Sequence, residues 1–170
     1  MVPIWDELCA HFEERADYFR IFDRFNLRPD PWLKVECLGV LARAGLSESV
    51  RDLRPDRHGC DVWIRTVQGD VWLAVRGLLT SYAGHARGSR PTLASIEEIV
   101  REMDKLRGLA TLGGGQPALF LAALPFGSER RERDEWAGQL RRFEARGFAP
   151  ARSGRVPLGD DRECLIYGFV

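Results

Sequence analysis

The sequence is short of lysine, of net charge and of long apolar runs. Only Lys34 and Lys105 are lysines among 25 basic residues, so the other basic residues are all arginine. The 25 basic residues are balanced by 25 acidic residues, so no global field favours nucleic acid, and any basic surface must be local. No segment approaches the roughly 18 consecutive apolar residues of a membrane-spanning helix. The N-terminus lacks the basic region and apolar core of a secretory signal, and we therefore expect a cytoplasmic protein.

Cysteine and histidine are also scarce, and their spacing does not suggest a metal site. The four cysteines form no CxxC pair, and each lies within an apolar run, which indicates small buried side chains. The three histidines are far apart in the sequence and show no ligand spacing. These residues are Cys9, Cys37, Cys60 and Cys164, together with His11, His58 and His85.

Hydrophobic periodicity and capping signals divide the chain into helices and strands. Asp30 and Pro31 mark the start of one helix, and Gly108 marks the end of another. The prediction comprises helices at 4–25, 31–44, 95–107 and 129–146, strands at 49–55, 60–67, 70–77, 118–126 and 163–170, and connectors at 81–91 and 111–117. This order predicts one α/β domain with a central mixed β-sheet flanked by helices. Residues 1–28 are expected to form an N-terminal helical extension, and residues 29–170 the core.

The stretch CDVWIRTVQGDVWLAVRG, residues 60–77, predicts a β-hairpin with a tight turn near Gly69. A two-residue turn there pairs odd-numbered residues of the first strand with even-numbered residues of the second, and paired residues share a face. One face is then wholly apolar and covers a helix. The other, mixed face carries Asp61, Trp63, Arg65, Trp72, Ala74 and Arg76. We therefore expect Asp61 and Arg76 to project from the same face of adjacent antiparallel strands.

The residues around this hairpin resemble those of a known superfamily. A helix bearing a glutamate, a strand opening with aspartate, a hairpin and a strand carrying E-x-K form the pattern of the PD-(D/E)xK nucleases. Glu36 and Asp61 match the first two features, whereas Ala74 and Arg76 stand at the carboxylate and lysine positions. The resemblance covers about residues 31–124 and implies a restriction-endonuclease-like fold. It also implies phosphodiester hydrolysis in which carboxylates hold Mg²⁺ and a lysine assists the nucleophile.

The two departures from the pattern predict loss of catalysis. Ala74 has no oxygen to offer a metal, and the guanidinium of Arg76 stays protonated at any working pH. The resemblance places Glu36, Asp61 and Arg76 at catalytic positions, with Asp61 and Glu36 as the metal ligands if Mg²⁺ is bound. The alternatives are structural: Asp61 pairs with Arg76, and Glu36 forms a salt bridge with an arginine.

Three classes of function remain open. The first is a degenerate nuclease-like domain that needs no cofactor and binds nucleic acid or a protein partner without cutting. The second is an active Mg²⁺-dependent endonuclease with a rearranged site. The third is a protein-interaction module of the inhibitor or immunity type. For nucleic-acid contact, the candidates are Arg76 with Arg87 and Arg90, because the segment around the last two lacks acidic residues.

Overall fold

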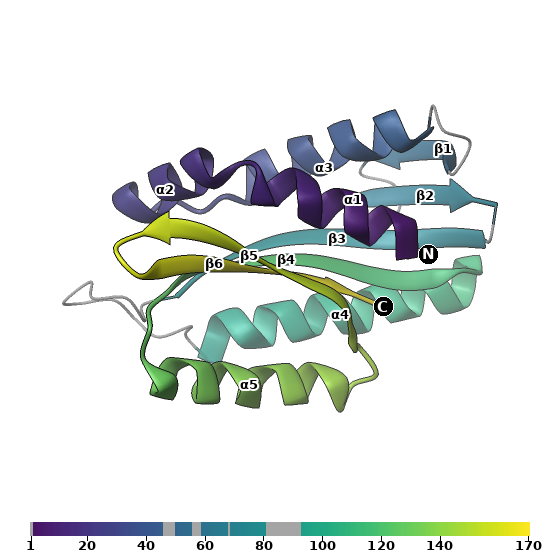
Figure 1. Ribbon diagram of the computed structural model, residues 1–170. Helices are drawn as coiled ribbons and strands as arrows, with labels where there is room; N and C mark the ends of the chain where they lie inside the picture. Colours follow the sequence, from purple (N-terminus) through teal and green to yellow (C-terminus); the bar gives the residue numbers. More distant parts are fainter. Residues whose placement is uncertain (1, 46–49, 56–58, 68, 81–92) are drawn as a thin grey trace.

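The computed structural model describes residues 2–45, 50–55, 59–67, 69–80 and 93–170 of the chain (Figure 1). These residues form five helices and six strands. The helices are α1 (Val2–Glu13), α2 (Ala16–Phe25), α3 (Asp30–Gly45), α4 (Leu93–Gly113) and α5 (Arg130–Glu144). The strands are β1 (Val50–Pro55), β2 (Val62–Thr66), β3 (Gly69–Leu79), β4 (Gln116–Phe126), β5 (Pro150–Gly159) and β6 (Arg162–Phe169).

The strands form one mixed sheet in the order β1-β2-β3-β4-β6-β5. Strands β3 and β4 are parallel, because the crossover through α4 returns the chain in the same direction, and the other neighbouring pairs are antiparallel. Helices α1, α2 and α3 lie over one face of the sheet, and α4 and α5 over the other (Figure 1). The predicted α/β fold with a central mixed sheet between helices is confirmed at this level.

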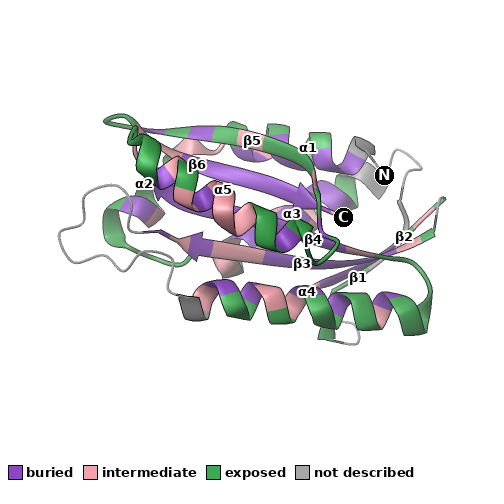
Figure 2. Ribbon diagram, turned by 90° about the horizontal axis from the view of Figure 1, so that it is seen from below, coloured by how far each residue is buried: buried purple, intermediate pink, exposed green. Residues whose placement is uncertain are grey.

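Strand β4 lies at the centre and is buried on both faces, as its continuous apolar run predicts. Phe120 and Ala122 point into the core under α1 and α3, whereas Leu119 and Leu121 point into the core over α4. Figure 2 shows the buried colour along the central strands and exposed residues on the outer faces of the helices. The sheet therefore separates two hydrophobic cores.

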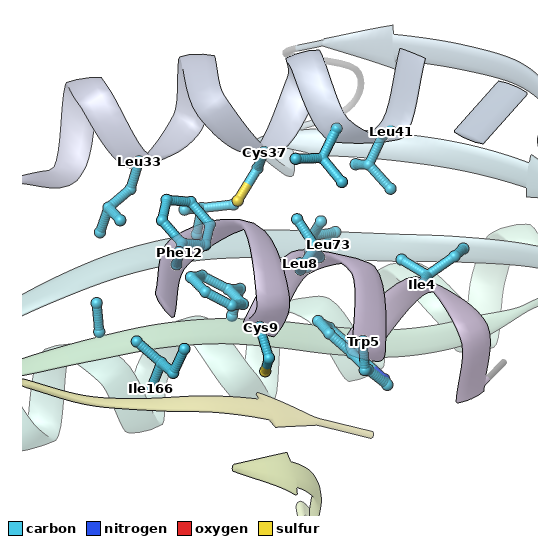
Figure 3. Close-up of a cluster of buried hydrophobic side chains, with 14 of the residues drawn as sticks. Ile4, Trp5, Leu8, Cys9, Phe12, Leu33, Cys37, Leu41, Leu73 and Ile166 are labelled. Atoms are coloured by element: carbon cyan, nitrogen blue, oxygen red, sulfur yellow. The ribbon is translucent and has the colours of Figure 1, made fainter. Parts of the chain in front are cut away.

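The N-terminal segment contributes to one of these cores and is divided into two helices. The predicted single helix over residues 4–25 is wrong, because Arg15 adopts non-helical backbone angles and tight hydrogen bonds replace the helical pattern there. The apolar spacing continues across the break, so the sequence pattern did not reveal it. Figure 3 shows Trp5 and Phe12 of α1 within the cluster of buried side chains on the face of the sheet that α3 also covers. Phe12 stacks on Phe120 at 4.9 Å between ring centroids.

Two other predictions differ from the structure. Helix α4 continues past Gly108 to Gly113, because Leu106 and Ala110 lie on the same buried stripe while Gly108 is exposed. Burial of that stripe outweighs the roughly 1 kcal/mol that a glycine costs within a helix. Strand β5 was not predicted, since it is an edge strand whose one exposed face carries polar residues in place of an apolar run.

The four cysteines are buried and free, as their apolar surroundings predict. Burial raises the pKa of Cys9 and of Cys60 to about 11, so both thiols stay protonated at neutral pH. No helix among the described residues is long and apolar enough to cross a membrane.

Candidate functional site

The hairpin has the predicted face assignment, although its turn lies one residue earlier than expected. Trp63 pairs with Trp72, and Thr66 pairs with Gly69, so odd-numbered residues of β2 still oppose even-numbered residues of β3. Trp63, Trp72 and Ala74 pack together in the core beneath α4. The tryptophans of the mixed face are therefore core residues in the structure.

Asp61 immediately precedes β2, and its carboxylate is fully engaged. Oδ2 accepts hydrogen bonds from the Val75 backbone N–H at 2.8 Å and from the Arg76 guanidinium. Oδ1 lies 2.7 Å from the ammonium of Lys34 on α3. Burial disfavours the charged form, but these donors and the charge of Arg76 outweigh it and hold the pKa of Asp61 below its usual value. Asp61 is therefore an ionised, buried structural acid, paired with Arg76 as one of the two alternatives predicted.

The guanidinium of Arg76 lies between two carboxylates. Nη1 binds Asp61, and Nη2 lies 3.0 Å from Oε1 of Glu102 on α4. Burial opposes the charge on Arg76, yet the two carboxylates raise the pKa of its guanidinium. Lys105 approaches Glu102 at 3.4 Å. We call this set the ion-pair cluster: Lys34, Asp61, Arg76, Glu102 and Lys105.

Glu102 is the member of the cluster that sequence reasoning missed. Its contact with Arg76 joins α4 to β3, two elements separated by a long stretch of chain. Within α4, Glu102 merely precedes the buried Met103 and stands three residues before Lys105, a pattern typical of a solvated helix edge. The local sequence therefore contained no signal for this contact.

Glu36 lies in a separate cluster. Its Oε2 is 2.5 Å from Nε2 of His11 and 4.0 Å from Nε of Arg15, both in the N-terminal segment. The predicted salt bridge with an arginine is thus present but long, and a histidine makes the closer contact. The structure brings Asp61 and Glu102 onto one guanidinium, whereas Glu36 contacts His11 and Arg15 instead.

The residues present do not fit a Mg²⁺ site. Magnesium needs oxygen ligands in a near-octahedral arrangement, but the Asp61 oxygens are taken by Lys34, Arg76 and a backbone N–H. Ala74 has no exposed surface and is enclosed by apolar side chains, so it leaves no room for metal-bound water. In the described parts of the chain, no group of three or more histidine, cysteine or acidic residues is placed to hold a metal ion.

The predicted nucleic-acid contacts are only partly visible. Arg76 is mostly buried, and its charge is neutralised by ion pairs with two carboxylates. Arg87 and Arg90 lie outside the described residues. Within the described site, the basic residue of β3 is therefore already paired and is not available to bind a phosphate group.

Comparison of the chain with family models, with curated proteins and with solved structures found no match. Its function must therefore be inferred from its own residues.

Proposed function

We propose that this protein is a non-cleaving domain of the restriction-endonuclease-like kind, derived from the PD-(D/E)xK pattern, that binds a partner and does not cut nucleic acid. The order α3, β1 to β3, α4 and β4 supports this reading, because it is the order that the resemblance implies. Asp61 before β2 and Arg76 in β3 also support it, because the resemblance implies an aspartate near the start of the first hairpin strand and a basic residue in the second.

The observation that carries the proposal is the placement of the Arg76 guanidinium between Asp61 and Glu102. In a nuclease of this pattern, a divalent cation would neutralise such carboxylates and activate water. The Arg76 guanidinium and the Lys34 ammonium together neutralise the two carboxylates, but a guanidinium activates no nucleophilic water and does not give up its proton. The charge balance of the site is preserved while its chemistry is lost.

A cleavage assay tests this directly. The purified protein is incubated with single-stranded and double-stranded DNA and RNA in Mg²⁺ or Mn²⁺, and calorimetry measures metal binding in parallel. We expect no cleavage above background and no Mg²⁺ binding at millimolar concentration. Metal-dependent cleavage that disappears in Asp61→Asn would contradict the proposal.

One observation favours an active endonuclease as the second candidate. Glu102 and Asp61 both bind the guanidinium of Arg76, so two carboxylates lie close together. A rearranged metal site would need such a pair. This candidate also requires Arg76 to leave the two carboxylates. Its signature would be metal-dependent cleavage lost in both Glu102→Gln and Asp61→Asn but retained in Glu98→Gln, which changes an exposed residue one turn earlier on α4.

A protein partner fits the site better than nucleic acid does. The net charge is zero, and Arg76 is neutralised within the ion-pair cluster, so neither supplies a field for phosphate. The inhibitor or immunity type of interaction module is included in this proposal, since a domain that has lost its chemistry acts by occupying a surface.

A further inference from the structure

Helix α2 exposes an apolar face that nothing in the described chain covers. Among the described residues, seven large hydrophobic side chains are exposed, and four of them lie between positions 18 and 27. They are Tyr18 (50% exposed), Ile21 (49%), Phe25 (61%) and Leu27 (49%). We call these four residues the α2 patch. Exposed apolar side chains that cluster in this way mark interaction surfaces more often than scattered ones do.

The α2 patch is held in place by its surroundings. Tyr18, Ile21 and Phe25 follow helical spacing along one side of α2, while the buried Phe19 anchors the opposite side in the core. Tyr18 stacks on Trp32 of α3 at 5.2 Å between ring centroids. The stacking on Trp32 restrains Tyr18 before any partner arrives, which lowers the entropy that this side chain loses on binding.

The end of α2 brings Leu27 back beside the helix. Asn26 takes a left-handed conformation, and the backbone N–H of Leu27 donates to the carbonyl of Phe22 at 2.9 Å. This arrangement closes the helix and extends the patch beyond its last turn.

The rim of the patch is basic. The guanidinium of Arg24 lies 5.6 Å from the ring centroid of Phe25, and Arg28 follows the helix. Within the described residues, neither Arg24 nor Arg28 forms an ion pair, whereas Arg20 is bound to Asp17 at 2.7 Å. The buried Asp23 faces away and pairs with Arg162 at 2.8 Å. An apolar strip beside two arginines that form no ion pair within the described residues is complementary to an apolar partner surface flanked by carboxylates.

We infer that the α2 patch docks an acidic amphipathic helix of a partner protein, with apolar residues on its inner face and glutamate or aspartate beside them. This inference rests on the proposed binding function and names the chemistry of its partner. Two helices pack through such apolar strips at 8–10 Å between axes, a distance at which Arg24 and Arg28 can reach flanking carboxylates. Tyrosine and arginine are also the residue types that most often carry binding energy at protein interfaces.

Two other occupants fit the α2 patch less well. A symmetric contact between two copies of this chain would place the arginines of two basic rims, Arg24 and Arg28 from each copy, at one interface. A membrane surface would be met by a helix of only 10 residues whose apolar side chains are about half covered, which leaves little area to insert. Both occupants give distinct results in the experiment below.

The test uses the full chain and two synthetic helical peptides of 18 residues. Both carry leucine at every third or fourth position, and they differ in having either glutamate or lysine beside the leucines. Fluorescence anisotropy measures the affinity of each labelled peptide at low and at physiological ionic strength. We expect the glutamate peptide to bind at least tenfold more tightly than the lysine peptide, with affinity that falls as salt increases.

Three variants locate the contact. Phe25→Ser removes the most exposed aromatic ring of the patch and should weaken the glutamate peptide tenfold or more. The double variant Arg24→Glu with Arg28→Glu should reverse the preference in favour of the lysine peptide. The control is Leu112→Ser, which changes an 89% exposed leucine on α4, on the other face of the sheet, and should leave affinity unchanged.

Several results would overturn the inference. These are absence of binding by the glutamate peptide at millimolar concentration, equal affinity for both peptides, or an equal loss in Leu112→Ser. Self-association that Phe25→Ser abolishes in analytical ultracentrifugation would assign the patch to a second copy. Binding to phosphatidylserine vesicles without peptide binding would assign it to a membrane. Peptide binding and cleavage are independent readouts, so failure here leaves the non-cleaving assignment standing.

Discussion

Arg76 in β3 donates a hydrogen bond to the carboxylate of Asp61, the residue that immediately precedes β2, and the same guanidinium binds Glu102 on α4. One side chain thus links the hairpin to the helix that crosses over to β4. This relationship has consequences for stability that do not depend on any binding activity.

Asp61→Asn should destabilise the protein in a pH-dependent way. It leaves Lys34 and Arg76 without their shared buried carboxylate, a loss of roughly 3 kcal/mol at neutral pH. Because the pKa of Asp61 is lowered in the folded state, its contribution is present above the unfolded value of about 3.9 and is lost as the pH falls through the folded value. The difference between wild type and variant, measured by urea unfolding, should therefore shrink below about pH 4.

The matched control for Asp61 is Asp17→Asn. Asp17 also pairs with an arginine, but its side chain is 87% exposed, so the change should have little effect at any pH. Equal losses in the two variants would show that Asp61 is not a buried structural acid.

Glu102→Gln should destabilise the fold although Glu102 lies outside the sequence motif. The substitution keeps the size of the side chain and removes the charge that faces Arg76, at a loss of about 1.5 kcal/mol. Glu98→Gln, on an exposed position of the same helix, should leave the melting temperature nearly unchanged. If thermal denaturation shows no difference between the two variants, the contact across the ion-pair cluster contributes nothing to stability.

If the protein binds nucleic acid, we expect Arg87 and Arg90 to contact the phosphate groups. If the protein binds duplex DNA, replacing both residues by alanine should weaken binding. It should also reduce the slope of log affinity against log salt by up to about two, at roughly 0.9 for each lost phosphate contact. Filter binding over a range of salt concentrations measures this slope. An unchanged slope would place the contact elsewhere, and no salt-dependent binding by the wild type would exclude this function.

Replacing Gly115 or Gly108 by alanine should change the stability of the protein in opposite directions. Gly115 has φ of +123°, and a Cβ atom there would lie 2.4 Å from the carbonyl oxygen of Asp70, so Gly115→Ala should cost about 3 kcal/mol. Gly108 lies in α4 with nothing within 4 Å of a Cβ atom, so Gly108→Ala should stabilise by up to about 1 kcal/mol. Thermal melting of both variants checks the pair, and a gain in Gly115→Ala would contradict the close approach.

Some features follow from short-range pattern and are visible in the sequence. Strand alternation and a tight turn place Trp63 and Trp72 on one face, whether the turn starts at residue 67 or one residue later, because both registers keep the same parity. The continuous apolar run of β4 likewise predicts a strand buried on both sides. Such features depend on residues within one or two elements, so local periodicity is sufficient to predict them.

Other features depend on what lies opposite in space. The edge strand β5 has no apolar run, and it is a strand because β6 offers it backbone hydrogen bonds. Helix α4 passes Gly108 because the sheet buries the stripe on either side of that residue. Glu102 belongs to the site because the crossover sets α4 beside β3.

The sequence by itself determined the alternating elements, the two faces of the hairpin and the identities of Ala74 and Arg76 in its second strand. Only the tertiary structure decided that Glu102 joins Asp61 at the guanidinium of Arg76, and that no described residue covers the apolar face of α2. The physical reason is that hydrogen-bonding periodicity acts between neighbours in the chain, whereas burial and ion pairing act between groups that only the packed fold brings together.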